Sequence, residues 1–318
     1  MRACRNKGRP RAAFAVRMEE KVINLIEHRG PLTGAEIRDA LSNYSFAQWK
    51  ACMLSSTLVV RKLGMRYLRL DHQVEGFARL SPSILREFLT YSVVGLTCDT
   101  AALDRRAQEI ISHIRAVSRC KLDLARAIIT GIASGLADGG EPEGRFCVII
   151  AGDIVYEMAH DVPRPERSTG RMVNGSDLDM IVILDDHAPE ALMKQLDDAI
   201  YKEKYRHLIN PSVREEIDYI IKRLERLREQ ATFDTFKKMV ACKILQEGML
   251  LYGSRALFNA AKDLLSEYKV TQKLDAMEKS AAQSRQRAEQ YLLGTHQSVL
   301  AGDDLYLFYT ADESEEFE

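Results

Sequence analysis

The segment NGSDLDMIVILDD, residues 174–186, constrains the fold of this chain more than any other stretch. It places Asp177 and Asp179 one residue apart, at the start of an apolar run that continues to Leu184. Such a run is typical of a strand that is buried on both faces of a sheet. Because side chains alternate along a strand, the two carboxylates are predicted to point to the same face.

Two carboxylates held this close repel each other unless a cation neutralises them. Mg²⁺ (or Mn²⁺) meets that need, because it binds hard oxygen ligands and keeps coordination positions for water and phosphate. The competing interpretation is a solvated strand start, in which Ser176 and Asp177 cap a turn. We expect a metal site formed by Asp177 and Asp179.

Composition narrows the class of protein. The chain has 318 residues, 46% hydrophobic and 29% charged, which is typical of a globular protein with one large or two ordinary domains. Its net charge of −1 gives no overall indication of a nucleic-acid partner. The six cysteines form no CxxC pair, so they indicate neither a disulfide framework nor a zinc site and fit a reducing compartment. No apolar run approaches the roughly 20 residues that span a bilayer, so we expect a cytoplasmic protein with no membrane partner.

The first part of the chain has the pattern of a winged helix. Helices are predicted over RMEEKVINLIEHRG, LTGAEIRDAL and SFAQWKACML, the second with a capping box from Thr33 to Glu36 and the third capped by Ser45. Two strand-like runs, TLVVRKL and MRYLRLD, follow on either side of Gly64 and predict a hairpin. Three helices followed by a hairpin is the order of a winged-helix domain.

A winged helix has two common uses, and both stay open for this one. In the first, the third helix and the hairpin bind nucleic acid (tRNA, other RNA or DNA). The hairpin residues expected to make that contact are Arg61, Lys62, Arg66 and Arg69. In the second, the domain serves protein contacts or packing alone. Trp49, on the third helix, is expected in the core.

The chain is predicted to fall into successive segments. They are a flexible basic arm (1–16), a winged-helix-like domain (17–96), a connecting long helix (97–140), a second domain (141–258), a C-terminal helical segment (259–309) and an acidic tail (310–318). The long helix is expected from Asp104 to about Ala137 because its apolar residues keep helical spacing, and DGGEPEGR then breaks the pattern. DDLYLFY, near the C-terminus, is expected as a short edge strand or a docking segment.

The second domain resembles the nucleotidyltransferase superfamily typified by DNA polymerase β. The resemblance covers about residues 145–260 and depends on a buried strand, FCVII, a glycine turn, AGD, and the carboxylate strand, SDLDMIVI. It implies an α/β (α+β) nucleotidyltransferase fold with a mixed sheet. It also implies transfer of a nucleoside monophosphate from an NTP, such as ATP, to an acceptor, with release of pyrophosphate.

The resemblance implies roles for individual residues. Asp177 and Asp179 would be catalytic metal ligands. The residues expected to bind the nucleotide are Gly152, Asp153, Ser176, Arg171 and Lys238. Two departures from the family pattern are visible: Asp153 stands where the family has serine, and the interval between Gly152 and Asp177 is long. Two interpretations stay open for the arginines in that interval, Arg164, Arg167 and Arg171: they offset Asp153 by binding the triphosphate, or they belong to a solvated loop.

The family also has a third carboxylate on a later strand, and EEIDYII offers Asp218. The surrounding sequence, residues 212–228, has apolar residues at helical spacing and a capping box at its start. Two interpretations follow, a helix throughout or a strand followed by a helix. We favour the second, with Asp218 as the third catalytic carboxylate.

Two classes of function remain. The first is a metal-dependent nucleotidyltransferase whose acceptor is an RNA, a protein, a small molecule or a nucleotide. The second is a catalytically degenerate relative that regulates by binding DNA or RNA through its winged helix. The paired aspartates favour the enzyme, whereas Asp153 and the open interpretation of the third carboxylate favour the regulator.

Overall fold

The computed structural model describes residues 12–41, 45–136, 144–166, 168–295 and 302–309. Four predicted features lie wholly or mostly outside these ranges: residues 1–11 of the basic arm, Arg167, most of the segment DGGEPEGR and the acidic tail. The rest of the predicted arm, residues 12–16, is not a flexible segment but the start of the first helix. The described residues form two compact units. The first contains residues 12–67, 80–112 and 282–309, and the second contains residues 68–79 and 113–281. The units therefore interleave along the chain, whereas the predicted domains followed one another.

Three helices and a small antiparallel sheet begin the first unit. The elements are α1 (Ala12–Arg29), β1 (Leu32–Thr33), α2 (Gly34–Leu41), α3 (Ser45–Leu54), β2 (Leu58–Lys62) and β5 (Ser92–Leu96), with the strands in the order β1–β5–β2. The predicted capping box is confirmed. The backbone N–H of Thr33 donates to Glu36 Oε2 at 2.7 Å, and the N–H of Glu36 donates to Thr33 Oγ1 at 3.2 Å.

The predicted hairpin around Gly64 is wrong. β2 pairs with β5, with Val60 opposite Val94, whereas β3 (Tyr67–Leu70) pairs with β4 (Ala78–Ser81). Gly64 has a φ of +72°, and the chain forms β3, β4 and α4 (Ile84–Thr90) before β5 returns to β2. β5 is the more apolar partner, with Val94 fully buried, and therefore takes the central place in the sheet.

The end of the described chain packs into the first unit. Residues Gly302–Leu307 form the 3₁₀ helix η5, so the expected edge strand is wrong and the docking segment is confirmed. The Phe308 ring lies 5.2 Å from that of Phe46 and 5.3 Å from that of Trp49. Trp49 is 4% exposed, so its predicted place in the core is confirmed.

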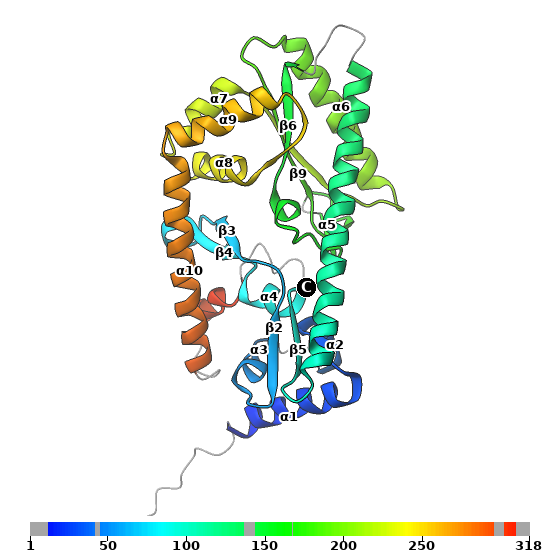
Figure 1. Cartoon of the computed structure of the whole chain (residues 1–318), viewed down its shortest axis with the longest axis vertical. Coiled ribbons are helices and arrows are strands. Elements are labelled where there is room, and N and C mark those ends of the chain that lie inside the picture. Colours follow the sequence, from blue (N-terminus) through cyan, green and yellow to red (C-terminus); the bar gives the residue numbers. More distant parts are fainter. Residues whose placement is uncertain (1–11, 42–44, 137–143, 167, 296–301, 310–318) are drawn as a thin grey trace, which may run out of the picture. The chain divides into compact units, whose positions relative to one another are not determined.

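A four-stranded mixed sheet forms the centre of the second unit (Figure 1). Its strands are β6 (Phe146–Ile150), β9 (Leu178–Leu184), β10 (Ile217–Arg223) and β11 (Met249–Gly253), in the order β10–β9–β6–β11. β9 and β10 are parallel, and the other neighbours are antiparallel. The predicted buried strands FCVII and LDMIVIL are confirmed, because every residue of β6 is fully buried and every residue of β9 except Asp179 is buried. The coarse expectation of an α/β chain with a mixed sheet is also confirmed.

Helices cover both faces of this sheet (Figure 1). On one side lie α6 (Glu190–Ile209) and the part of α5 (Thr100–Leu136) that belongs to this unit; on the other lie α7 (Leu224–Ala231), α8 (Phe236–Glu247) and α9 (Arg255–Glu267). The long helix predicted from Asp104 to about Ala137 is confirmed as α5. Ile129 of α5 and Ile200 of α6 belong to the same core cluster as Val148 and Val182, so these helices bury the β6 and β9 side chains of one face.

The C-terminal helical segment divides into two helices, α9 and α10 (Val270–Gly294). They separate at Lys269, which has a φ of +55°, and α10 ends at Gly294 as its sequence predicts. Among the residues that the structure describes, no helix combines the length and the apolar character that crossing a membrane requires.

Candidate active site

Asp218 and Asp179 lie opposite each other in the parallel register of β10 and β9. Parallel neighbours in register point to the same face of the sheet, so the two carboxylates converge. Asp177 lies directly before β9 and joins them. One ligand oxygen from each aspartate lies within 4.8 Å of the other two. The structure therefore brings together all three predicted carboxylates.

The strand interpretation of EEIDYII is confirmed. β10 spans Ile217–Arg223, and α7 begins only at Leu224, so a helix through 212–228 is wrong. The N–H of Leu178 donates to the carbonyl oxygen of Glu216 at 2.9 Å and starts the β9–β10 pairing. Long-range pairing with a buried strand outweighs the local helical periodicity here.

Charge accumulates at Asp179. Burial raises the pKa of its carboxyl group well above the usual value, and the negative charges of Asp177, Asp153 and Asp218 raise it further. The positive charge of Arg69 partly offsets them. Burial and three neighbouring carboxylates therefore disfavour a negative charge on Asp179, and oxygen ligands at this spacing fit a divalent cation such as Mg²⁺.

Gly152 lies against the carboxylate of Asp179. Its φ is +71°, and a Cβ atom added to it would lie 2.2 Å from Asp179 Oδ2. Both observations require glycine at this position. The carbonyl oxygen of Asp179 also accepts a hydrogen bond from the N–H of Ala151 at 2.9 Å, so the predicted turn and the carboxylate strand are held together.

Asp153 and Ser176 are joined by a hydrogen bond. The Ser176 hydroxyl donates to Asp153 Oδ2 at 2.9 Å and accepts from the N–H of His160 at 3.2 Å. Ser176 is 4% exposed. Asp153 thus belongs to the acidic surroundings of Asp179, where the family resemblance would place a serine.

Arg164 anchors the loop before β9. It lies 3.7 Å from Asp177 Oδ2 and 2.9 Å from Glu216 Oε2, and its Nε donates to the carbonyl oxygen of Gly175 at 2.9 Å. These contacts place Arg164 beside Asp177 and Glu216, and its contact with a triphosphate stays a prediction. Arg171 is exposed, and its carbonyl oxygen accepts from the N–H of Glu166 at 2.7 Å.

Lys238 makes its described contacts with residues other than Asp177, Asp179 and Asp218. From the first turn of α8, Lys238 binds Asp234 at 2.8 Å and the Thr232 hydroxyl at 2.9 Å, both of which precede the helix. Lys243, further along the same helix, instead binds Glu247, whose Oε1 accepts the N–H of Gly152 at 3.4 Å. Lys243, rather than Lys238, is thus linked to the glycine turn through Glu247.

Sequence reasoning missed the cluster behind the glycine turn. The hydroxyl of Tyr156 donates to Glu247 Oε2 at 2.7 Å, and burial raises the pKa of this tyrosine. Lys243 and Glu247 lie one helical turn apart, a spacing that was readable in the sequence. Their approach to Gly152 depends on the packing of α8 and was not readable.

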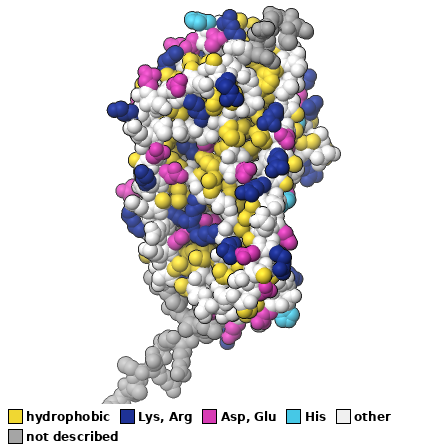
Figure 2. All heavy atoms as spheres, in the orientation of Figure 1, with side chains coloured by type: hydrophobic (Ala, Val, Ile, Leu, Met, Phe, Trp, Pro, Cys, Tyr) yellow, Lys and Arg dark blue, Asp and Glu magenta, His cyan; other side chains and the backbone are white. Residues whose placement is uncertain are grey.

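Three of the four residues predicted to bind nucleic acid form ion pairs with acids. Arg61 pairs with Asp104 at 2.7 Å, and Lys62 and Arg66 pair with Glu87 at 3.1 and 2.7 Å. Arg69 belongs to the second unit, where its charge acts on Asp179. On the face that Figure 2 shows, Lys and Arg side chains lie singly or in small groups among Asp and Glu side chains.

The expected recognition helix is also engaged within its own unit. Lys50 of α3 donates to the carbonyl oxygen of Leu292 at 3.0 Å and to that of Thr295. Gln48 is fully buried. These contacts favour packing over base recognition by α3.

Compared with models of known protein families and with characterised proteins, the chain matches none. The case for its function therefore depends on the site described above.

Proposed function

We propose that this protein is a metal-dependent nucleotidyltransferase, which moves a nucleoside monophosphate from an NTP to an acceptor and releases pyrophosphate. One observation carries the proposal. Asp177, Asp179 and Asp218 converge from two adjacent parallel strands, each with a ligand oxygen within 4.8 Å of the others. A turn at which only glycine fits lies directly against them.

The three carboxylates have different roles in the proposed reaction. Asp177 and Asp179 would hold Mg²⁺ or Mn²⁺, which supplies positive charge for the triphosphate and for the departing pyrophosphate. Asp218 is 51% exposed at its side chain and would accept the proton of the attacking hydroxyl. Gly152 would let the phosphates approach the backbone, since it carries no side chain.

For the first unit we propose a winged-helix domain used for protein contacts. The order of its first three helices and the strand order β1–β5–β2 support that fold. The ion pairs of Arg61, Lys62 and Arg66 and the engagement of Lys50 favour protein contacts over DNA or RNA binding.

The degenerate relative remains the second candidate, because two acids surround the glycine turn. Asp153 follows it, and Glu247 accepts its N–H at 3.4 Å. Both would repel a triphosphate unless metal or conformational change offsets them. This candidate would bind an NTP weakly and transfer nothing.

One experiment separates the two candidates. The full chain is incubated with each α-labelled NTP, with Mg²⁺ or with EDTA, in the presence of cell extract. Metal-dependent label transfer, lost in the Asp177→Asn, Asp179→Asn double variant, supports the enzyme. Retention of full transfer by that variant would contradict the proposed site, and NTP binding without transfer would favour the regulator.

A further inference from the structure

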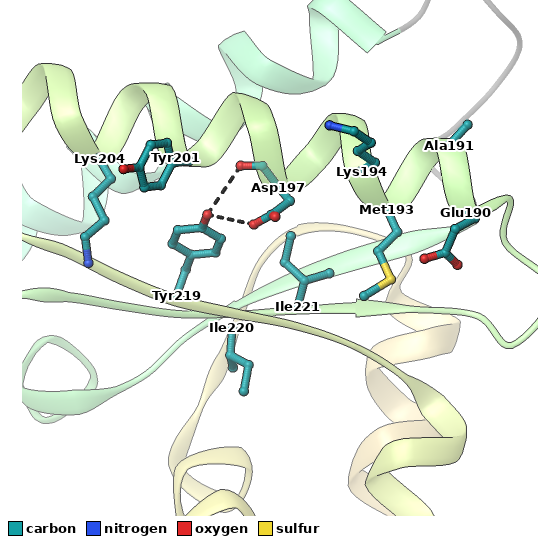
Figure 3. Close-up of a pocket in the computed structure, with 10 residues that line it drawn as sticks. All are labelled: Glu190, Ala191, Met193, Lys194, Asp197, Tyr201, Lys204, Tyr219, Ile220 and Ile221. Atoms are coloured by element: carbon teal, nitrogen blue, oxygen red, sulfur yellow. Dashed lines mark hydrogen bonds between the residues drawn. The ribbon is translucent and has the colours of Figure 1, made fainter.

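A groove of about 700 Å³ runs between α6 and β10, the strand that carries Asp218 (Figure 3). Tyr219 and Ile221 point from β10 toward α6, whereas Ile220 points away from it (Figure 3). The Tyr219 hydroxyl donates to Asp197 Oδ1 at 2.7 Å and ties the strand to the helix. The groove thus lies along β10, and one of its lining residues, Lys204, pairs with Asp218 at 2.7 Å.

β10 is an edge strand. In the described sheet its one neighbour is β9, and the carbonyl oxygen of Glu216 points to that neighbour because it accepts the N–H of Leu178. Backbone groups alternate in direction along a strand, so those of Tyr219 and Ile221 face the open edge. An extended chain is the natural partner of such an edge.

Exposed apolar side chains lie on both β10 and α6. Ile220, two residues after Asp218 and on the same face of β10, is 51% exposed. On α6, Tyr201 lines the groove and is 64% exposed, and Tyr205 and Ile209, which follow it at four-residue intervals, are 57% and 39% exposed. Apolar residues along an open strand edge are typical of interaction sites.

The charges of the groove favour a peptide over a nucleic acid. Its two lysines are already paired, Lys194 with Asp198 at 2.6 Å and Lys204 with Asp218 at 2.7 Å. The acids Glu190 and Asp197 also line it. A phosphate backbone needs excess positive charge, whereas an added strand is held by main-chain hydrogen bonds.

We propose that the free edge of β10 binds an extended segment of a partner protein as an added strand, and that a Ser or Thr hydroxyl of this segment is the acceptor. The inference rests on the proposed nucleotidyltransferase function and names its substrate class. In an antiparallel pair, the residue opposite Asp218 has its Cβ roughly 4.5–5.5 Å from that of the aspartate, on the same face. A Ser or Thr there brings its hydroxyl to the Asp218 carboxylate.

The transfer step then balances. The hydroxyl oxygen forms a bond to the α-phosphorus of the NTP, while the bond from that phosphorus to the oxygen bridging the β-phosphate breaks. Pyrophosphate leaves with the electron pair, and the hydroxyl proton passes to the Asp218 carboxylate. The product is a nucleoside monophosphate in phosphodiester linkage to the peptide.

The test compares three probes with α-labelled NTP and Mg²⁺. They are a short random peptide library with a central Ser or Thr, the same library with a central Ala, and short random-sequence RNA with a free 3′ hydroxyl. We expect label on the Ser/Thr library alone. Labelling of the RNA without labelling of either peptide library would overturn this inference and leave the proposed function standing. If the protein neither bound NTP nor labelled any probe, both the inference and the proposed function would be overturned.

Two substitutions locate the peptide on the sheet. Ile220→Lys puts a charged edge residue beside Asp218 and should lower peptide labelling roughly tenfold, the equivalent of about 1.4 kcal/mol. Met249→Lys is the matched control, because Met249 is 41% exposed on β11, the opposite edge of the same sheet, and should leave labelling unchanged. Equal labelling by both variants would overturn the edge assignment.

A third variant guards against misfolding. Tyr201→Ala removes an exposed groove side chain on α6, so it should fold normally and lower labelling several-fold. Thermal unfolding of all variants separates loss of the fold from loss of the peptide. A correctly folded Tyr201→Ala protein with wild-type labelling would contradict the groove as the binding surface.

Discussion

Asp218 stands directly opposite Asp179 across two parallel strands, and both carboxylates face Asp177. The two residues are far apart in the chain, and the interval between them contains the whole of α6. Their meeting converts a pair of neighbouring aspartates into a three-carboxylate site. The sharpest tests of the proposed chemistry act on this relationship.

Replacing Asp218 with Asn should abolish transfer and spare NTP binding, because Asp177 and Asp179 still hold the metal. The substitution removes the proton acceptor and little volume. Label transfer and equilibrium NTP binding, measured on the same preparation, check the two halves of the expectation. Wild-type transfer by this variant would contradict the catalytic role of Asp218.

The double variant Asp177→Asn, Asp179→Asn should be more stable than the wild type in EDTA at neutral pH. The folded protein raises the pKa of Asp179, so ionising that carboxyl costs stability as pH rises above its unfolded pKa. Asparagine cannot ionise, and the cost disappears. Added Mg²⁺ should raise the melting temperature of the wild type and leave that of the variant unchanged; the opposite order in EDTA would contradict the electrostatic account.

Gly152→Ala should strongly impair metal binding and transfer. The new Cβ would lie 2.2 Å from Asp179 Oδ2, so the carboxylate or the turn must move. Gly170→Ala is the matched control, since Gly170 also has a positive φ, +66°, but nothing lies within 4 Å of its added Cβ. The control should cost only the backbone strain of roughly 1–2 kcal/mol and retain transfer. Equal loss of transfer in both variants would show that backbone strain, and not the contact with Asp179, causes the loss.

The first unit should lose stability in acid through Glu87. Burial alone would raise the pKa of this carboxyl, but the hydrogen bond from Arg66 and the charges of Arg285 and Lys62 outweigh it and hold the pKa at about 2. Because the folded pKa lies below the ordinary 4.5, the stabilisation is present above that pH and is lost as pH falls toward 2.

Glu87→Gln should remove this dependence and cost roughly 3 kcal/mol at neutral pH. Glu109→Gln is the control, because Glu109 pairs with Arg106 at the surface and its side chain is 66% exposed. Thermal unfolding between pH 2 and pH 7 compares the two. An acid transition unchanged in Glu87→Gln would contradict the assignment.

Several features of the fold were determined locally and were therefore predictable from the sequence. Runs of consecutive apolar residues such as those in β6 and β9 are stable only in the core of a sheet covered on both faces. Both strands form where predicted. The capping box from Thr33 to Glu36 joins residues within one helical turn. The convergence of Asp177 and Asp179 likewise follows from the alternation of side chains along a single strand.

Other features were decided by the tertiary structure. Residues 217–223 carry a helical pattern, yet they form β10 because β9 offers a buried edge to pair with. Lys62 and Arg66 were predicted to lie on a basic hairpin. In the structure they form ion pairs with Glu87 and Glu289, which are distant in the chain. Local rules depend on residues a few positions apart, whereas strand partners and ion pairs depend on which surfaces meet when the chain folds. The sequence therefore predicted the paired aspartates of the candidate site and, through the family resemblance, Asp218, whereas only the folded structure supplied Glu247 and Arg69 as their neighbours.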